Sequence, residues 1–189
     1  MYYFFRKDSK EFIYAKHDDE KHGEEIVIKG DDDLEKHAPY LKIDQGSVVK
    51  MTDEEIRKLR LVRVRDRAIR DINSITEWSI KKKSINYKDK NFSLSEHAQA
   101  NWLRRAYLAK QDSSATFDVT TTDDQTAHFT SEEVTEIIKE IDQFIEGELN
   151  TARTNKQIVK AKKTTEEIID HMIANDYIKE EFKESWEKY

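Results

Sequence analysis

Residues 130–152 read TSEEVTEIIKEIDQFIEGELNTA, and this stretch decides the fold that we expect. Its apolar side chains recur at steps of three and four residues, the period of an amphipathic helix. This apolar stripe consists of Val134, Ile137, Ile138, Ile141, Phe144, Ile145, Leu149 and Ala152. Thr130 and Glu133 have the T-x-x-E spacing of a capping box, in which each side chain accepts a hydrogen bond from an otherwise unpaired amide. None of the inward positions is a nucleophile, a metal ligand or a phosphate-binding group, so the stretch predicts architecture and not chemistry.

Further helices are predicted on both sides of this stretch by the same signals. Thr52 and Glu55 open a helix that runs to about residue 82, with the apolar stripe Leu61, Val64, Ala68, Ile72 and Ile75. Ser93 and Glu96 form another capping box, before a helix whose expected inward residues are Ala98, Leu103, Trp102, Ala106 and Tyr107. The central helix should continue past residue 152. Thr164 and Glu167 either cap a new helix or lie inside a continuous one.

Strands are expected mainly at the front, because three of the four glycines and the only proline lie within residues 1–50. Aromatic and β-branched residues predict a hairpin over 2–15 and strands over 25–29 and 40–50. Two short hairpins are expected at 84–93 and 115–129. The predicted fold is α+β, mainly α, with a small β-rich N-terminal module at 1–50, a helical domain at 51–162 and a C-terminal helical extension at 163–189.

The composition narrows the class of protein. There is no cysteine, so disulfide and thiolate chemistry are excluded. The apolar start covers only residues 1–5, too short for a signal peptide or a membrane span of roughly 20 residues. We therefore expect a soluble protein made in a cytoplasm, with no membrane partner. The formal net charge of −6 argues against nucleic-acid binding over the whole surface.

Residues 60–162 resemble an uncharacterised domain family of tailed bacteriophages. The likeness lies in a basic helix (RVRDRAIRDI), a turn unit (INYKDKNFSLSEHAQANW), a Thr-rich hairpin and the helix start FTSEEVTEI. The family occurs on the C-terminal side of tail, tail-fibre and tail-fibre-assembly proteins, and the segment before it is similar to small β modules that often precede the family. The resemblance implies a virion-tail setting and transfers no catalytic residue. The last 25 residues depart from the family pattern.

A basic helical face is the first candidate binding site, and it consists of Arg60, Arg63, Arg67 and Arg70. Between residues 57 and 83 there are ten basic and three acidic residues, so this segment is near +7 while the rest of the chain is near −13. Arginine forms forked hydrogen bonds with carboxylates and phosphates alike. The face is an ordinary solvated surface, a docking site for an acidic protein surface, or a nucleic-acid contact.

A second candidate partner-binding set lies near the C-terminus, where Ile178, Phe182, Trp186 and Tyr189 share one side of a predicted short helix. Trp186 is the strongest candidate anchor, since tryptophan is enriched at the energetic centres of interfaces; packing onto its own domain is the alternative. Gly147, with Thr151, leaves a small-residue notch in the central helix that would allow another helix to approach. A glycine without a role is the alternative there.

Histidine and carboxylate side chains gather only in the acidic loop at 17–22 and near Asp31, Asp32, Asp33 and His37. Lysines interrupt these runs, and no H-E-x-x-H or calcium-loop spacing is present. We therefore expect a solvated loop, no metal site and no cofactor.

These observations together lead to a hypothesis of function. We expect a non-enzymatic structural or adaptor component of a bacteriophage tail, in the tail-fibre or baseplate region. It would bind other tail or tail-fibre proteins as a homo- or hetero-oligomer, located in the virion and, during assembly, in the host cytoplasm. A tail-fibre assembly chaperone is the alternative, and a small metal-dependent enzyme or a nucleic-acid binder is a more remote one.

Overall fold

The computed structural model describes residues 1–17, 19 and 23–188. It is mainly helical, with an N-terminal strand module and short antiparallel hairpins among long helices, which confirms the predicted α+β class. The chain forms two compact units, Met1–Val62 and Arg63–Tyr189, which are described separately. The sequence suggested divisions after residues 50 and 162; the boundary between the compact units lies inside the first long helix, and the C-terminal extension is part of the second unit.

The first unit is built on a three-stranded antiparallel sheet with strand order β2-β1-β3. The strands are β1 (Tyr2–Arg6), β2 (Phe12–Lys16) and β3 (Glu25–Lys29), as the sequence predicted. Successive side chains of a strand point to opposite faces. Tyr3 and Phe5 are therefore buried on one face, together with Leu41 and Val48. On the other face, the ring of Phe4 stacks on Tyr14 at a centroid distance of 4.5 Å.

A separate hairpin follows the sheet, formed by β4 (Leu41–Asp44) and β5 (Ser47–Lys50) after the 3₁₀ helix η1 (Asp32–His37). Gln45 and Gly46 form its turn with φ values of 47° and 82°. Two positive φ angles are typical of the tight turns whose twist matches that of antiparallel strands. The segment predicted as a strand over 40–50 is thus a hairpin of its own and does not extend the three-stranded sheet.

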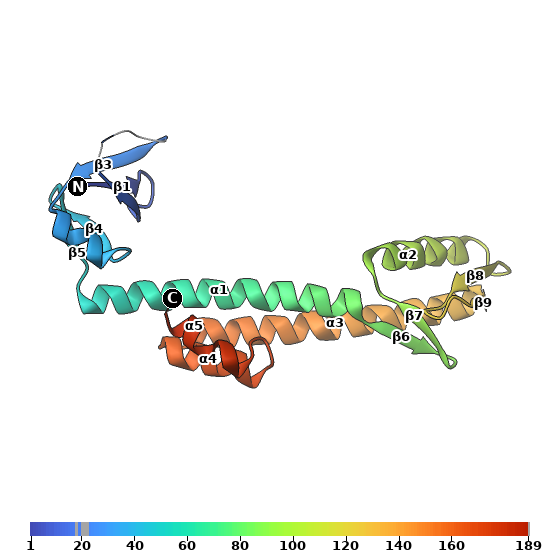
Figure 1. Ribbon diagram of the computed structural model, residues 1–189. Coiled ribbons are helices and arrows are strands. Elements are labelled where there is room, and N and C mark those ends of the chain that lie inside the picture. Colours follow the sequence, from blue (N-terminus) through green and yellow to red (C-terminus); the bar gives the residue numbers. More distant parts are fainter. Residues whose placement is uncertain (18, 20–22, 189) are drawn as a thin grey trace. The chain divides into compact units, whose positions relative to one another are not determined.

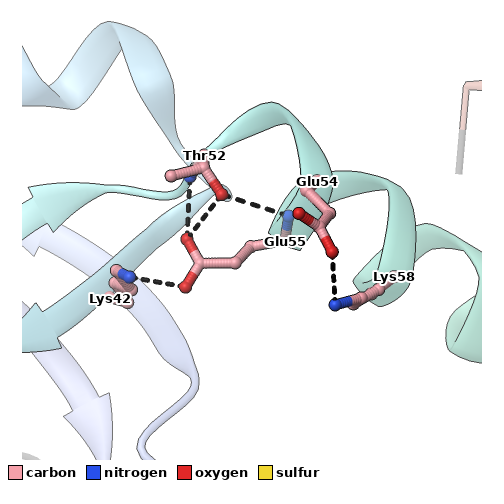
Figure 2. Close-up of polar contacts among 5 residues, drawn as sticks. All are labelled: Lys42, Thr52, Glu54, Glu55 and Lys58. Atoms are coloured by element: carbon pink, nitrogen blue, oxygen red, sulfur yellow. Dashed lines mark hydrogen bonds and ion pairs between the residues drawn. The ribbon is translucent and has the colours of Figure 1, made fainter.

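Figure 2 shows how the start of α1 (Asp53–Lys82) is held. The Thr52 hydroxyl accepts a hydrogen bond from the Glu55 amide at 3.3 Å, and the Glu55 carboxylate accepts one from the Thr52 amide at 2.8 Å. This is the predicted capping box. Lys42 donates to the same carboxylate at 2.5 Å. The hydrogen bond from Lys42 has the largest effect on the pKa of Glu55, and together with the bond from the Thr52 amide it lowers that pKa to about 2. One carboxylate thus joins β4 to the first turn of α1.

The second unit contains two hairpins and two helices around a common core (Figure 1). These elements are β6 (Ser84–Tyr87), β7 (Lys90–Ser93), α2 (Glu96–Gln111), β8 (Thr116–Thr120), β9 (Thr126–Thr130) and α3 (Ser131–Ala161). Phe92, Trp102 and Phe129 meet at the centre of the core. The Phe92 ring lies edge-on to both, at centroid distances of 5.6 Å from Trp102 and 5.5 Å from Phe129. Such edge-to-face contacts favour one orientation of helix and hairpins.

Two predictions for α2 were wrong. The N-cap is Ser95, whose hydroxyl accepts from the Ala98 amide, whereas Ser93 is the last residue of β7. Leu103 and Tyr107 do not face the core, because their exposed fractions are 62% and 63%. The inward stripe runs instead through Trp102 and Ala109.

Helix α3 begins with the predicted capping box of Thr130 and Glu133. It continues without interruption to Ala161, and Val134, Ile137 and Ile141 are buried as its stripe predicted. Thr164 then caps a separate helix, α4 (Thr165–Ala174), which settles the choice that the sequence left open.

The remainder of α3 packs antiparallel to the α1 residues of the second unit (Figure 1). Arg65 donates a hydrogen bond to the Lys162 carbonyl at 2.9 Å, and Lys156 donates to Asn73 at 2.8 Å. Residue numbers therefore increase along α1 where they decrease along α3, as in an antiparallel pair of helices. The C-terminal elements η2 (Glu180–Phe182) and α5 (Lys183–Glu187) follow α4.

Candidate protein-binding surfaces

Some side chains of the predicted arginine face make contacts within the chain. Arg70 is exposed, whereas Arg60, Arg63 and Arg67 are half-buried. The central guanidinium carbon of Arg67 lies 4.3 Å from the centroid of the Trp186 ring, and its Nε lies 3.8 Å from Asp71. A guanidinium over an indole face gains cation–π attraction. At Arg67 the face therefore stabilises the second unit, and its exposed part is centred on Arg70.

Of the C-terminal candidate residues, some are buried within the chain and others are exposed. Trp186 is only 2% exposed, so it packs onto its own domain, which is the alternative that the sequence left open. Phe182 is 51% exposed and Ile178 is half-buried. Tyr189 lies outside the described residues. In this structure Phe182, and not Trp186, is accessible for a partner contact.

A groove that the sequence did not predict lies between α2 and the N-terminal half of α3. The Ser131 hydroxyl donates to the Asp112 carbonyl at 2.7 Å, which joins the end of α2 to the start of α3. The two helices run antiparallel (Figure 1). Ala106 and Lys110 line the groove from α2. From α3 it is lined at helical steps by residues between Thr135 and Asn150. Its volume is about 680 Å³ and it opens to solvent.

The rim of this α2–α3 groove is apolar on the α2 side. Leu103 and Tyr107 belong to the same face of α2 as Ala106 and Lys110, since these four positions follow the i, i+3, i+4, i+7 spacing of one helix face. Most of each side chain is exposed, as given above. On α3, Ile138 is half-buried in the groove and Gly147 leaves a gap, since a Cβ added there would meet nothing within 4 Å. Contiguous exposed apolar side chains mark interaction sites more often than scattered ones do.

The sequence contains the residues that form this groove but does not indicate that they lie on one surface. Leu103 and Tyr107 form a second stripe beside Trp102 on α2, and a helix with two stripes has more apolar surface than one core contact covers. Gly147 predicts a notch in the central helix, but the sequence does not indicate which helix lies beside it. The sequence does not indicate that α2 pairs with α3, and this pairing brings both features to one surface.

The sequence places His, Asp and Glu residues in the loop at 17–22 and near residues 31–37. Among the described residues, no three His, Asp or Glu side chains lie close enough together to hold a metal ion. Asp18, Glu20, Lys21 and His22 of this loop lie outside the described residues. Asp32 is instead an ion-pair partner of the chain's own N-terminal ammonium group, which lowers the pKa of its carboxyl.

No family model, curated protein or solved structure matches this chain. In the described part of the chain, no helix combines the length and apolar character needed to cross a membrane.

Proposed function

We propose that the chain is a non-enzymatic structural or adaptor component of a bacteriophage tail, in the tail-fibre or baseplate region. It acts by binding other proteins. The phage setting rests on the resemblance of residues 60–162 to a domain family of tail and tail-fibre proteins. The mode of action rests on the α2–α3 groove.

The observation that carries this proposal is the exposed apolar rim of Leu103 and Tyr107 beside an open groove. A partner that buried Leu103 fully would gain part of the roughly 1.5–3 kcal/mol that complete burial of an exposed leucine contributes, since 62% of Leu103 is exposed. The groove lining adds charges of both signs and amide side chains. Protein interfaces likewise combine an apolar centre with polar groups around it. Phe182 and Arg70 supply further exposed positions.

The two helices that form the groove are held in place by specific contacts, as a rigid adaptor requires. Helix α3 has a complete capping box, and Trp102 of α2 packs edge-on to Phe92 of β7 within the core that α2 shares with α3. A preformed surface loses less conformational entropy on binding than a flexible one does. The spacing between partners would then be set by the length of these helices.

Mass spectrometry of purified phage particles that encode the chain tests this proposal. We expect the chain in mature virions at several copies per particle. Its presence on fibre-assembly intermediates alone would instead support an assembly chaperone. Its absence from both particles and intermediates would contradict a role in the tail.

A further inference from the structure

The charges along the α2–α3 groove change sign from one end to the other. Lys110 and Lys139 lie toward the start of α3, and Asp142 and Glu146 follow toward its middle. Within the described part of the chain, Lys139 and Asp142 have no ion-pair partner, whereas Glu146 is 2.9 Å from Arg153 of the same helix. A uniformly acidic or basic partner would meet repulsion at one end of the groove. A partner with the reverse order of charges would not.

We infer that the partner of this groove is a second copy of the chain, which packs its own α3 antiparallel across the first about a two-fold axis. This inference rests on the proposed protein-binding function and names one partner for it. In a two-fold interface the same patch is used on both subunits, so the patch must complement itself. The groove residues of α3 meet this requirement when the axis passes between Asp142 and Gln143.

The charged positions pair across such an axis. Lys139 would lie opposite Glu146 of the second copy, and Glu146 opposite its Lys139. Asp142 would face Gln143, whose amide can donate a hydrogen bond to the carboxylate. A parallel arrangement would instead place Lys139 near Lys139 and Glu146 near Glu146. The charge order thus selects the antiparallel direction.

The apolar positions pair about the same axis. Ile138 would lie opposite Gly147 of the second copy, where the missing side chain leaves room for the isoleucine. At the outer ends, Thr135 would face Asn150, and both are polar groups that can share a hydrogen bond. Because α2 flanks the groove, its rim residues Leu103 and Tyr107 would contact α3 of the second copy. The result is a four-helix arrangement of two α2 and two α3 helices.

Charge reversals test this geometry on the purified full-length chain by sedimentation equilibrium over a range of concentrations. We expect the wild type to sediment as a dimer, with twice the chain mass of 22.4 kDa. Either Lys139→Glu or Glu146→Lys should weaken the dimer by about tenfold or more, because two-fold symmetry makes each change repulsive in two pairs. An equimolar mixture of the two variants should form a heterodimer, since each reversed charge again meets its opposite.

Two further variants separate the interface from helix stability. Gly147→Leu should weaken the dimer while the far-UV circular dichroism of the chain stays unchanged, because the added side chain fills the notch. Glu140→Lys, the matched control, makes the same charge change as Glu146→Lys at an exposed position of α3 outside the groove lining, and should leave the dimer intact. A wild type that stays monomeric at all concentrations would overturn the inference, as would single variants that dimerise like the wild type or a mixture that does not associate. A monomer would leave the tail assignment standing, since that assignment is tested in particles.

Discussion

The guanidinium of Arg67 covers the indole ring of Trp186, with its central carbon 4.3 Å from the ring centroid. This contact joins α1 to α5 and leaves Trp186 only 2% exposed. Arginine and tryptophan are both common at protein interfaces, but here Arg67 and Trp186 contact each other within one chain. The surfaces that remain for partners are therefore different from those with the most conspicuous sequence signals.

Replacing Trp186 should destabilise the second unit. We expect Trp186→Ala to lower the free energy of unfolding by about 3–5 kcal/mol, because a large buried side chain is lost and a cavity remains. Phe182→Ala is the control from the same segment, and since Phe182 is 51% exposed it should cost less than about 1 kcal/mol. Urea unfolding followed by circular dichroism measures both. Equal effects of the two variants would show that Trp186 is not packed as described.

Removing the cap of α3 should also weaken the second unit. Thr130→Ala is expected to cost about 1 kcal/mol, since the hydroxyl that accepts from the Glu133 amide is lost. Thr154→Ala provides a matched comparison on the same helix. Thr154 is exposed and its hydroxyl only donates back to the Asn150 carbonyl, so alanine should be neutral or slightly stabilising there. A Thr130→Ala protein with wild-type stability in thermal unfolding would argue against the capping box.

The ion pair of Lys42 and Glu55 predicts a pH dependence for the first unit. The folded-state pKa of Glu55 is about 2, below its ordinary value of 4.5, so its ionised form favours folding. This contribution is present above about pH 4.5 and is lost as the pH falls toward 2. In Glu55→Gln, the amide oxygen can still accept from Thr52, but the charge is absent.

Amide hydrogen exchange of peptides from residues 41–60 measures this effect. The wild type should be better protected than Glu55→Gln at pH 6, and the difference should shrink as the pH approaches 3. Lys42→Met should behave like Glu55→Gln, because it removes the other charge of the pair. A difference that does not change between pH 6 and pH 3 would contradict the assignment.

Gly147→Ala should stabilise the monomeric chain by about 1 kcal/mol. Glycine is unfavourable in a helix relative to alanine, and the added methyl group meets no neighbour within 4 Å. Thermal unfolding at concentrations below dimer formation measures this gain. A loss of stability would show that the position is more crowded than the structure indicates.

Much of the fold could be predicted because its determinants are local. The capping boxes of Thr52 and Thr130 place two helix starts correctly, since each depends on two side chains three residues apart. The same spacing at Thr164 indicates a third start without deciding it against a continuous helix. The hairpin turns depend on adjacent residues in the same way. Lys88 and Asp89, for example, both have positive φ between β6 and β7.

The errors arose where a choice depends on distant residues. Ser93 and Ser95 both offer a hydroxyl near the start of α2, and the extent of β7 decides that Ser95 is the cap. Likewise, α2 has two apolar stripes. The one through Trp102 faces inward because Phe92 and Phe129 surround that ring, which leaves Leu103 exposed. The groove could not be predicted for the same reason, since it requires knowing which helix lies beside which.

A photo-reactive amino acid at Leu103, introduced into the chain during phage production, tests the central claim most directly. The account predicts that purified particles or their assembly intermediates contain the chain covalently joined to another protein molecule, a second copy or a tail component. The same probe at Glu140, outside the groove lining, should give far less of this product. Particles and intermediates in which the Leu103 probe yields only uncrosslinked chain would contradict the claim that this surface binds proteins.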